Sequence, residues 1–202
     1  MAVAGGVSGA GRGLRCLRLG LLAAVVATAG GTAAADESGG QTICLGRYAL
    51  CSSAECHPIE NEPESVRCDC EVPPEGLNVG NSSCQSRAAS LTSTFSLWDL
   101  TATETKAAKR SLACTGELGG PWAFCLDARC TETDAGGAEC TCDLRPASDY
   151  YTFTDRCPET EAERRESCGK IWSAALQTEL LSGYTQLWSF YADIPELEYC
   201  PR

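Results

Sequence analysis

The feature that most constrains this chain is a pattern of six cysteines that occurs twice. The first copy comprises Cys44, Cys51, Cys56, Cys68, Cys70 and Cys84. The second copy comprises Cys114, Cys125, Cys130, Cys140, Cys142 and Cys157. Successive cysteines are separated by 6, 4, 11, 1 and 13 residues in the first copy and by 10, 4, 9, 1 and 14 in the second. The shared spacing predicts a fold built twice around the same cysteine framework.

Two further cysteines, Cys168 and Cys200, stand outside this pattern. The simplest pairing joins them to each other, and the entropy of closing a loop of about 30 residues predicts a contribution of roughly 3 kcal/mol. The alternative is that Cys168 rather than Cys157 is the sixth cysteine of the second copy. Because six cysteines allow 15 pairings, the spacing leaves the connectivity within each copy open.

The first 35 residues have the layout of a secretory signal peptide. Three arginines precede an apolar run at 19–29, and Ala33-Ala34-Ala35 offers a cleavage site before Asp36. The apolar run has 11 residues, too few for a helix that spans a bilayer about 30 Å thick. A retained signal anchor is the alternative. We therefore predict a secreted, periplasmic or extracellular protein with no membrane span after cleavage.

If the protein is exported, its cysteines are expected to form disulfides, because disulfides persist in oxidising compartments. Fourteen cysteines follow the predicted cleavage site, an even number. A zinc site is disfavoured because no C-x-x-C occurs and His57 is the only histidine. The sequence therefore predicts seven disulfides, no metal and no cofactor.

The mature chain is strongly acidic. The whole chain has a formal net charge of −11, and cleavage removes three arginines but no acid, which gives about −14. Such a surface repels phosphate groups, so nucleic acid and anionic lipid are poor partners. A protein or a glycan remains as the predicted partner.

Strict alternation marks one strand in each copy. At 66–72, Val66, Cys68 and Cys70 fall on one face, with charged residues between them, and 138–144 repeats this pattern around Cys140 and Cys142. Short apolar segments at 47–51 and 122–125 supply a second strand, and polar loops at 57–65 and 131–137 join each pair. We predict a disulfide-pinned β-hairpin in each copy.

An aromatic segment follows each cysteine copy. Residues 91–98 resemble 180–188, because both end in Leu-Trp after a small polar pair and an aromatic ring. Apolar residues spaced as on one helix face predict a C-terminal helix; they are Leu176, Leu180, Tyr184, Leu187 and Tyr191.

Three further local features have predicted structures. A capping-box pattern at 101–104 predicts a short linking helix to about residue 112, and 159–167 is predicted to be an exposed acidic insertion. In the segment 150–154, alternation predicts that Tyr151 and Phe153 point inward and Tyr150 outward.

These features together predict a small disulfide-rich α+β fold of two tandem hairpin modules. The predicted divisions are a signal peptide at 1–35, a flexible leader at 36–43, a first module at 44–100, a linker at 101–113 and a second module with the C-terminal helix at 114–202.

No residue set points to catalysis, so the catalytic residues remain unknown. A nucleophile would need His57 as its base, but His57 lies in a loop and the second copy has no equivalent. Pairs of acids such as Asp69 with Asp143, or Glu55 with Asp127, could serve a carboxylate hydrolase, yet nothing distinguishes them from the other acids. The duplication itself argues against a single catalytic centre.

The sequence therefore favours a non-enzymatic structural or binding protein outside the cytosol. A secreted protease inhibitor that presents residues 57–63 as an exposed loop is the first alternative, and a carboxylate-dependent hydrolase is the second. Asn81-Ser82-Ser83 fits an N-glycosylation sequon, which would matter in a eukaryotic host.

Overall fold

The two C-x-C segments form neighbouring antiparallel strands at the centre of the protein. Our computed structural model describes residues 41–201 except 192 and 194, so the predicted signal peptide and most of the predicted leader lie outside the described residues. Strand β3 (Glu62–Cys70) pairs with β8 (Ala138–Ser148), and Cys68 lies opposite Cys140. The alternation explains the strand: Val66, Cys68 and Cys70 are buried, whereas the charged residues between them are exposed.

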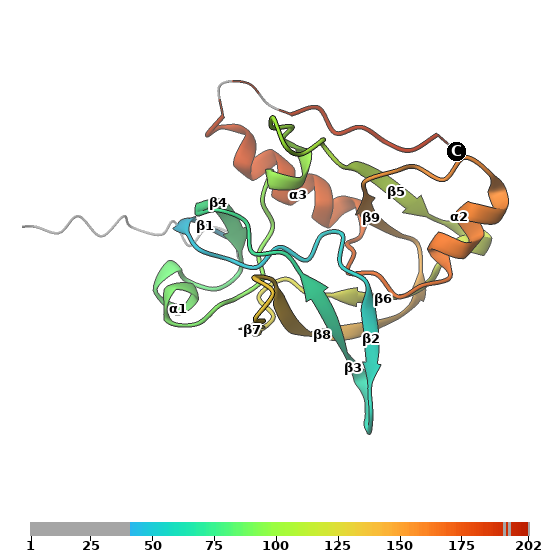
Figure 1. Ribbon diagram of the computed structural model, residues 1–202, viewed down its shortest axis with the longest axis horizontal. Helices are drawn as coiled ribbons and strands as arrows, with labels where there is room; N and C mark the ends of the chain where they lie inside the picture. Colours follow the sequence, from blue (N-terminus) through green and yellow to red (C-terminus); the bar gives the residue numbers. More distant parts are fainter. Residues whose placement is uncertain (1–40, 192, 194, 202) are drawn as a thin grey trace, which may run out of the picture. The chain divides into compact units, whose positions relative to one another are not determined.

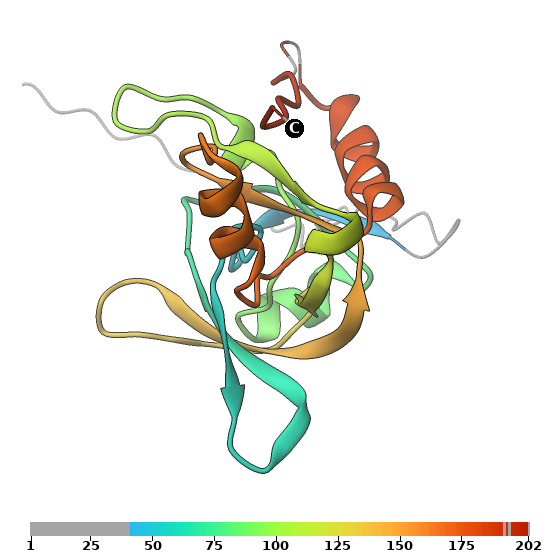
Figure 2. The ribbon, with the colours of Figure 1, turned by 90° about the vertical axis from the view of Figure 1, so that its right-hand side faces the viewer.

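Three more strands complete this central sheet. Strand β2 (Cys56–Ile59) pairs with β3, and β6 (Gly120–Phe124) and β7 (Cys130–Glu132) both pair with β8. The β2–β3 hairpin turns at Asn61, which has a positive φ of 65°. Asparagine tolerates this left-handed conformation better than most residues. The tip of the hairpin projects away from the other strands (Figures 1 and 2).

Two small strand pairs and several helices surround the central sheet. Strand β1 (Thr42–Gly46) pairs with β4 (Gly76–Gly80), and β5 (Arg110–Cys114) pairs with β9 (Tyr150–Thr154). The α-helices are α1 (Cys84–Ala89), α2 (Glu161–Cys168) and α3 (Gln177–Trp188). Two 3₁₀ turns, η1 (Trp98–Leu100) and η2 (Gly116–Leu118), complete the described elements. The predicted disulfide-rich α+β character and the C-terminal helix are confirmed.

Residues 42–96 and 110–175, which we call the first and second halves, make corresponding contacts. A parallel bridge joins Ala49 to Ser93 in the first half, and another joins Ala123 to Ser173 in the second. Likewise Val79 bridges Phe95, and Tyr151 bridges Ala175. Contacts between the halves also match, because Thr92 bridges Arg129 and Trp172 bridges Glu55.

Seven disulfides join the fourteen cysteines among the described residues. Three lie in the first half: Cys44–Cys84, Cys51–Cys70 and Cys56–Cys68. Their counterparts in the second half are Cys114–Cys168, Cys125–Cys142 and Cys130–Cys140. The seventh is Cys157–Cys200.

The predicted Cys168–Cys200 pair is therefore wrong. Cys168 is the counterpart of Cys84, and Cys157 and Cys200 form the disulfide without a counterpart. The physical reason is α2, which ends at Cys168 and places that residue beside β5, next to Cys114. Residues 159–167, predicted to be an exposed insertion, largely form this helix.

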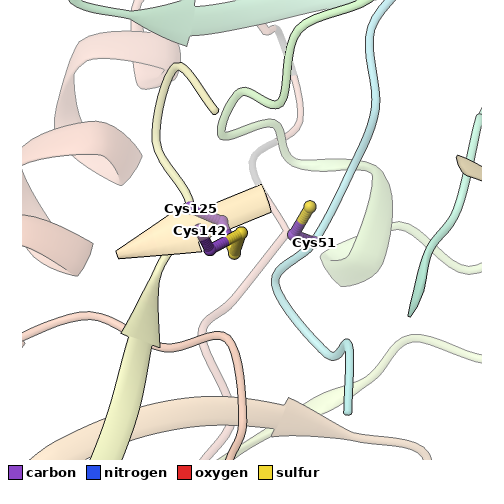
Figure 3. A group of neighbouring side chains, drawn as sticks. All are labelled: Cys51, Cys125 and Cys142. Atoms are coloured by element: carbon purple, nitrogen blue, oxygen red, sulfur yellow. A yellow bond between two sulfur atoms is a disulfide. The ribbon is translucent and has the colours of Figure 1, made fainter. Parts of the chain in front are cut away.

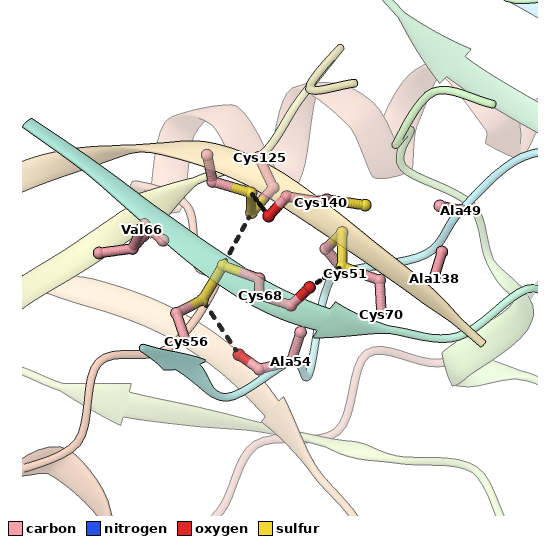
Figure 4. Close-up of a cluster of buried hydrophobic side chains, with 12 residues drawn as sticks. Ala49, Cys51, Ala54, Cys56, Val66, Cys68, Cys70, Cys125, Ala138 and Cys140 are labelled. Atoms are coloured by element: carbon pink, nitrogen blue, oxygen red, sulfur yellow. Dashed lines mark hydrogen bonds between the residues drawn. A yellow bond between two sulfur atoms is a disulfide. The ribbon is translucent and has the colours of Figure 1, made fainter. Parts of the chain in front are cut away.

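The two halves share one core. Twelve buried residues around the β3–β8 pair, seven of them cysteines, come from both halves. The sulfur atoms of Cys68 and Cys125, which belong to different disulfides and different halves, lie 3.5 Å apart (Figure 4). Neither half therefore buries its cysteines independently of the other.

Three local predictions are wrong. Residues 101–109 form no helix, and β5 begins at Arg110. In β9, Tyr150 is fully buried rather than outward-facing, and burial raises the pKa of its phenol to about 12. The segments 91–98 and 180–188 do not have corresponding structures either. The first is extended chain that forms β-bridges and leads into η1, whereas the second lies in α3.

Helix α3 packs against the first half at a glycine. Leu180, Gly183 and Leu187 are its buried residues. A Cβ atom at Gly183 would lie 2.8 Å from Cδ1 of Phe95, which is closer than carbon atoms can pack. The glycine that weakens the helix locally is thus the residue that lets the helix approach Phe95.

Candidate binding cavity between the two halves

A cavity of about 220 Å³ lies where corresponding segments of the two halves meet. Its lining contains pairs of corresponding residues, namely Cys51 with Cys125, Ser52 with Leu126, Ser93 with Ser173, and Phe95 with Ala175. Gln41, which precedes β1, and residues of α3 line further sides of the cavity. The cavity is therefore a product of how the halves are joined, and neither half could form it alone.

Backbone pairing positions the segments that line the cavity. The backbone N–H of Ser93 donates to the carbonyl of Ala128, and the backbone N–H of Ser173 donates to the carbonyl of Ala54. Each bond crosses from one half to the other. The lining segments are thus held by the same interface that creates the cavity.

Two half-cystines, Cys51 and Cys125, line the cavity. The sulfur atoms of Cys51, Cys125 and Cys142 lie within 4.8 Å of one another (Figure 3). All three belong to disulfides, so they offer no thiolate, which is the form of cysteine that binds metals. The other two groups of closely spaced ligand atoms among the described residues also consist of half-cystines. The geometry therefore supports a structural role for these cysteines rather than a metal site.

Aromatic and aliphatic side chains form the walls. They are Phe95, Phe124, Leu126, Tyr151, Phe153 and Leu180. Four of them lie on three different elements: β6 carries Phe124, β9 carries Tyr151 and Phe153, and α3 carries Leu180. An enclosure of this kind favours an apolar ligand because burial of apolar surface is the dominant gain on binding.

Polar side chains also line the cavity, and several of them already have hydrogen-bond partners. Glu179 is the one carboxylate in the lining, and it accepts a hydrogen bond of 2.9 Å from the backbone N–H of Leu176. The Ser52 hydroxyl donates to Asp99 at 2.7 Å, and the Ser93 hydroxyl donates to the carbonyl of Cys125. No lysine or arginine lines the cavity among the described residues.

A buried ion group lies behind Ser52. Asp99 is 1 % exposed, and its carboxylate lies 3.2 Å from the ammonium of Lys109, which also binds Glu71 at 2.6 Å. Burial alone would lower the pKa of Lys109, but the carboxylates of Asp99 and Glu71 raise it above its usual value. The ammonium therefore compensates the buried charge of Asp99, and this group offers no free charge to a ligand.

The structure does not bring the candidate catalytic acids together. Asp69 pairs with Glu139 in the β3–β8 register, whereas Asp143 pairs with Ser65, four positions away. That separation is about 13 Å along the strands. Glu55 instead binds Lys170 at 2.8 Å. These acids therefore provide no geometry for shared catalysis.

Two other sequence candidates lie on the surface. His57 is half exposed, and its Nε2 lies 3.8 Å from the exposed carboxylate of Asp69. Asn81 is exposed at the rim of the cavity, and its backbone N–H donates to Asp127 at 2.6 Å. Glycosylation of Asn81 stays a prediction.

Sequence reasoning missed the cavity because its lining comes from seven separate segments. The one local signal was the pair of apolar runs that end in Cys51 and Cys125. Comparisons found no protein-family model, no curated protein and no solved structure that matches this chain. Of the helices in the described residues, none combines the length and the hydropathy that crossing a bilayer requires.

Proposed function

We propose that this protein is an exported, non-enzymatic binding protein whose cavity takes a small apolar molecule. The observation that carries the proposal is the largely apolar cavity between the halves. Seven disulfides support an oxidising compartment, as in secreted proteins. The two halves are proposed to be copies of one unit, with modules at 44–100 and 114–202 that share a core.

The volume limits the size of the ligand. An engineered apolar cavity of about 150 Å³ stays dry and binds benzene, whereas drug-sized ligands need about 300 Å³ or more. A cavity of about 220 Å³ lies between these limits. It therefore suits one or two rings, or a short alkyl chain. Because Glu179 lines the cavity and no cation does, a neutral or cationic ligand is favoured over an anion.

A cavity-filling substitution tests this proposal. Ala175 lines the cavity at the position that corresponds to Phe95, so Ala175→Phe would occupy the space. We expect the wild-type protein to bind neutral probes such as indole and 1-aminonaphthalene in calorimetry or fluorescence titration. Ala175→Phe should weaken binding at least about tenfold, which corresponds to 1.4 kcal/mol.

Ala107→Phe is the matched control, because Ala107 is exposed and does not line the cavity. It should bind the probes as the wild type does. Equal binding by Ala175→Phe, or no binding of any apolar probe by the wild type, would contradict the proposal. If the cavity binds an apolar side chain of a peptide but no free small molecule, the ligand is a partner protein.

The projecting β2–β3 hairpin supports a second candidate, the protease inhibitor. Its tip, Ile59–Glu62, is largely exposed, and the Cys56–Cys68 disulfide pins its base. A pre-organised loop loses little entropy on binding. Stoichiometric inhibition of one member of a protease panel, abolished by Ile59→Asp, would support this function. Cleavage at the tip without inhibition would reject it.

A further inference from the structure

The disulfide Cys44–Cys84 differs from the other six in accessibility. It joins β1 to α1, and Cys84 is exposed, whereas the other thirteen half-cystines of the described residues are buried or half-buried. Thiol–disulfide exchange requires that a thiolate reach one sulfur atom of the bond. Cys84 therefore offers the most accessible point of attack in the disulfide framework.

A buried guanidinium lies against the other sulfur atom. Arg87 is 5 % exposed, and its Nη2 lies 2.7 Å from Sγ of Cys44. Its Nη1 donates to Oδ1 of Asn78 at 2.8 Å, and Nη2 also donates to the carbonyl of Thr42. The group that touches the disulfide is thus a cation fixed in place by neutral acceptors.

This cation has no direct anionic partner in the part of the chain that the structure describes. Within the described residues, no carboxylate lies within 4.0 Å of the Arg87 guanidinium, and its buried Nε has no hydrogen-bond partner. Asp127 is the nearest acid that acts on it, but that carboxylate accepts the backbone N–H groups of Asn81 and Ser82. An unpaired buried charge is costly, and an anion formed beside it would lower that cost.

We propose that Cys44–Cys84 is a thiol-reactive site at which an external thiol opens the disulfide. The incoming thiolate forms a bond with Sγ of Cys84 while the bond between Cys84 and Cys44 breaks. The electron pair of that bond leaves on Cys44, whose thiolate pairs with the Arg87 guanidinium. A monothiol stops at this stage as a mixed disulfide on Cys84, which is a covalent modification of the protein.

A dithiol carries the reaction to completion. Its second thiolate attacks its own sulfur in the mixed disulfide, which closes a cyclic disulfide and releases Cys84 as a thiolate. The dithiol loses two electrons and the protein disulfide gains two. The direction of attack follows from the structure, because the leaving thiolate is the one that a cation stabilises and a better leaving group departs faster.

The corresponding disulfide of the second half lacks these features. Both Cys114 and Cys168 are buried. Tyr150 takes the place that Asn78 has in the first half, and its hydroxyl donates to the carbonyl of Cys168 at 3.2 Å. This disulfide therefore provides an internal reference with the same strand pairing but with both of its cysteines buried.

Timed reduction of the wild-type protein tests the site. The folded protein is incubated with dithiothreitol under native conditions, quenched with iodoacetamide at intervals, and digested for mass spectrometry. We expect Cys44 and Cys84 to be labelled first, at least about tenfold faster than Cys157 and Cys200. Glutathione should give an adduct on Cys84. Earlier opening of another disulfide, or simultaneous opening of all seven, would overturn the proposal.

Substitution of Arg87 separates a chemical role from a structural one. Arg87→Gln should slow the opening of Cys44–Cys84 about tenfold relative to Cys157–Cys200 in the same molecule, because the leaving thiolate loses its cation. Arg87→Lys should retain part of the rate. If Arg87 only held β1 and α1 together, Arg87→Gln would loosen them and accelerate opening, which is the opposite result and would overturn the assigned role of Arg87.

Discussion

The strand pairs β1–β4 and β5–β9 have corresponding places in the two halves, but different side chains fill the space beneath them. In the first half, Asn78 and Arg87 form a buried polar group beside Cys44. In the second half, the fully buried ring of Tyr150 packs with Leu112, Trp122 and the Cys114–Cys168 disulfide. The same backbone arrangement thus accommodates either polar or apolar buried side chains.

The disulfides explain this tolerance. Each strand pair is tied by a disulfide to the helix that follows it, through Cys84 or Cys168. A covalent link holds the backbone in place without a large apolar core, so side chains can diverge at little cost to the fold. We infer that this divergence of side chains gave the second half an apolar packed site and the first half a reactive disulfide.

The largest expected difference between the halves is the loss of stability when the buried residue beneath each strand pair is replaced. Tyr150→Ala should destabilise the protein by about 3–5 kcal/mol, because it empties a fully buried aromatic site. Asn78→Ala, at the corresponding position, should cost about 1–3 kcal/mol, since it removes the hydrogen bond to Arg87. Urea unfolding with intact disulfides measures both. Equal costs would mean that the two fillings contribute alike and that the comparison fails.

A second prediction tests whether the halves depend on each other. The double variants Cys56→Ala/Cys68→Ala and Cys130→Ala/Cys140→Ala remove corresponding disulfides with sequence separations of 12 and 10. Each should cost about 3 kcal/mol by the chain-entropy model. Because the cysteines share one core, either variant should lower hydrogen-exchange protection in both halves.

Segment-resolved hydrogen exchange with mass spectrometry provides the measurement. Faster exchange confined to the half that carries the substitution would show that the halves unfold independently. The wild-type protein and a variant that lacks Cys157–Cys200, which has no counterpart, serve as references.

The smallest expected effect on stability concerns the corresponding positions Phe95 and Ala175. The halves differ there because α3 packs against Phe95. Gly183→Ala should cost about 1–2 kcal/mol, since the strain of the added methyl group exceeds the gain in helix propensity. Thr178→Ala, at an exposed position of α3, should be neutral or slightly stabilising. Thermal melting compares the two. A stabilising Gly183→Ala would show that α3 does not need its close approach to Phe95.

The sequence by itself determined the local framework of this protein. Alternation around Cys68–Cys70 and Cys140–Cys142 identified the central strands, because side chains alternate between the faces of a strand regardless of its partners. The cysteine pattern indicated disulfides, and the apolar spacing around Leu180 and Leu187 indicated a C-terminal helix. These features depend on neighbours close in sequence.

Only the tertiary structure decided which segments meet. Cys168 pairs with Cys114 because α2 carries it back to β5, and sequence spacing does not encode that path. The cavity and the buried Arg87 likewise depend on segments that are remote in sequence. A charge or an apolar side chain gains its role from what surrounds it. The join between the halves sets the surroundings of the cavity, whereas β1 and β4 of the first half set those of Arg87.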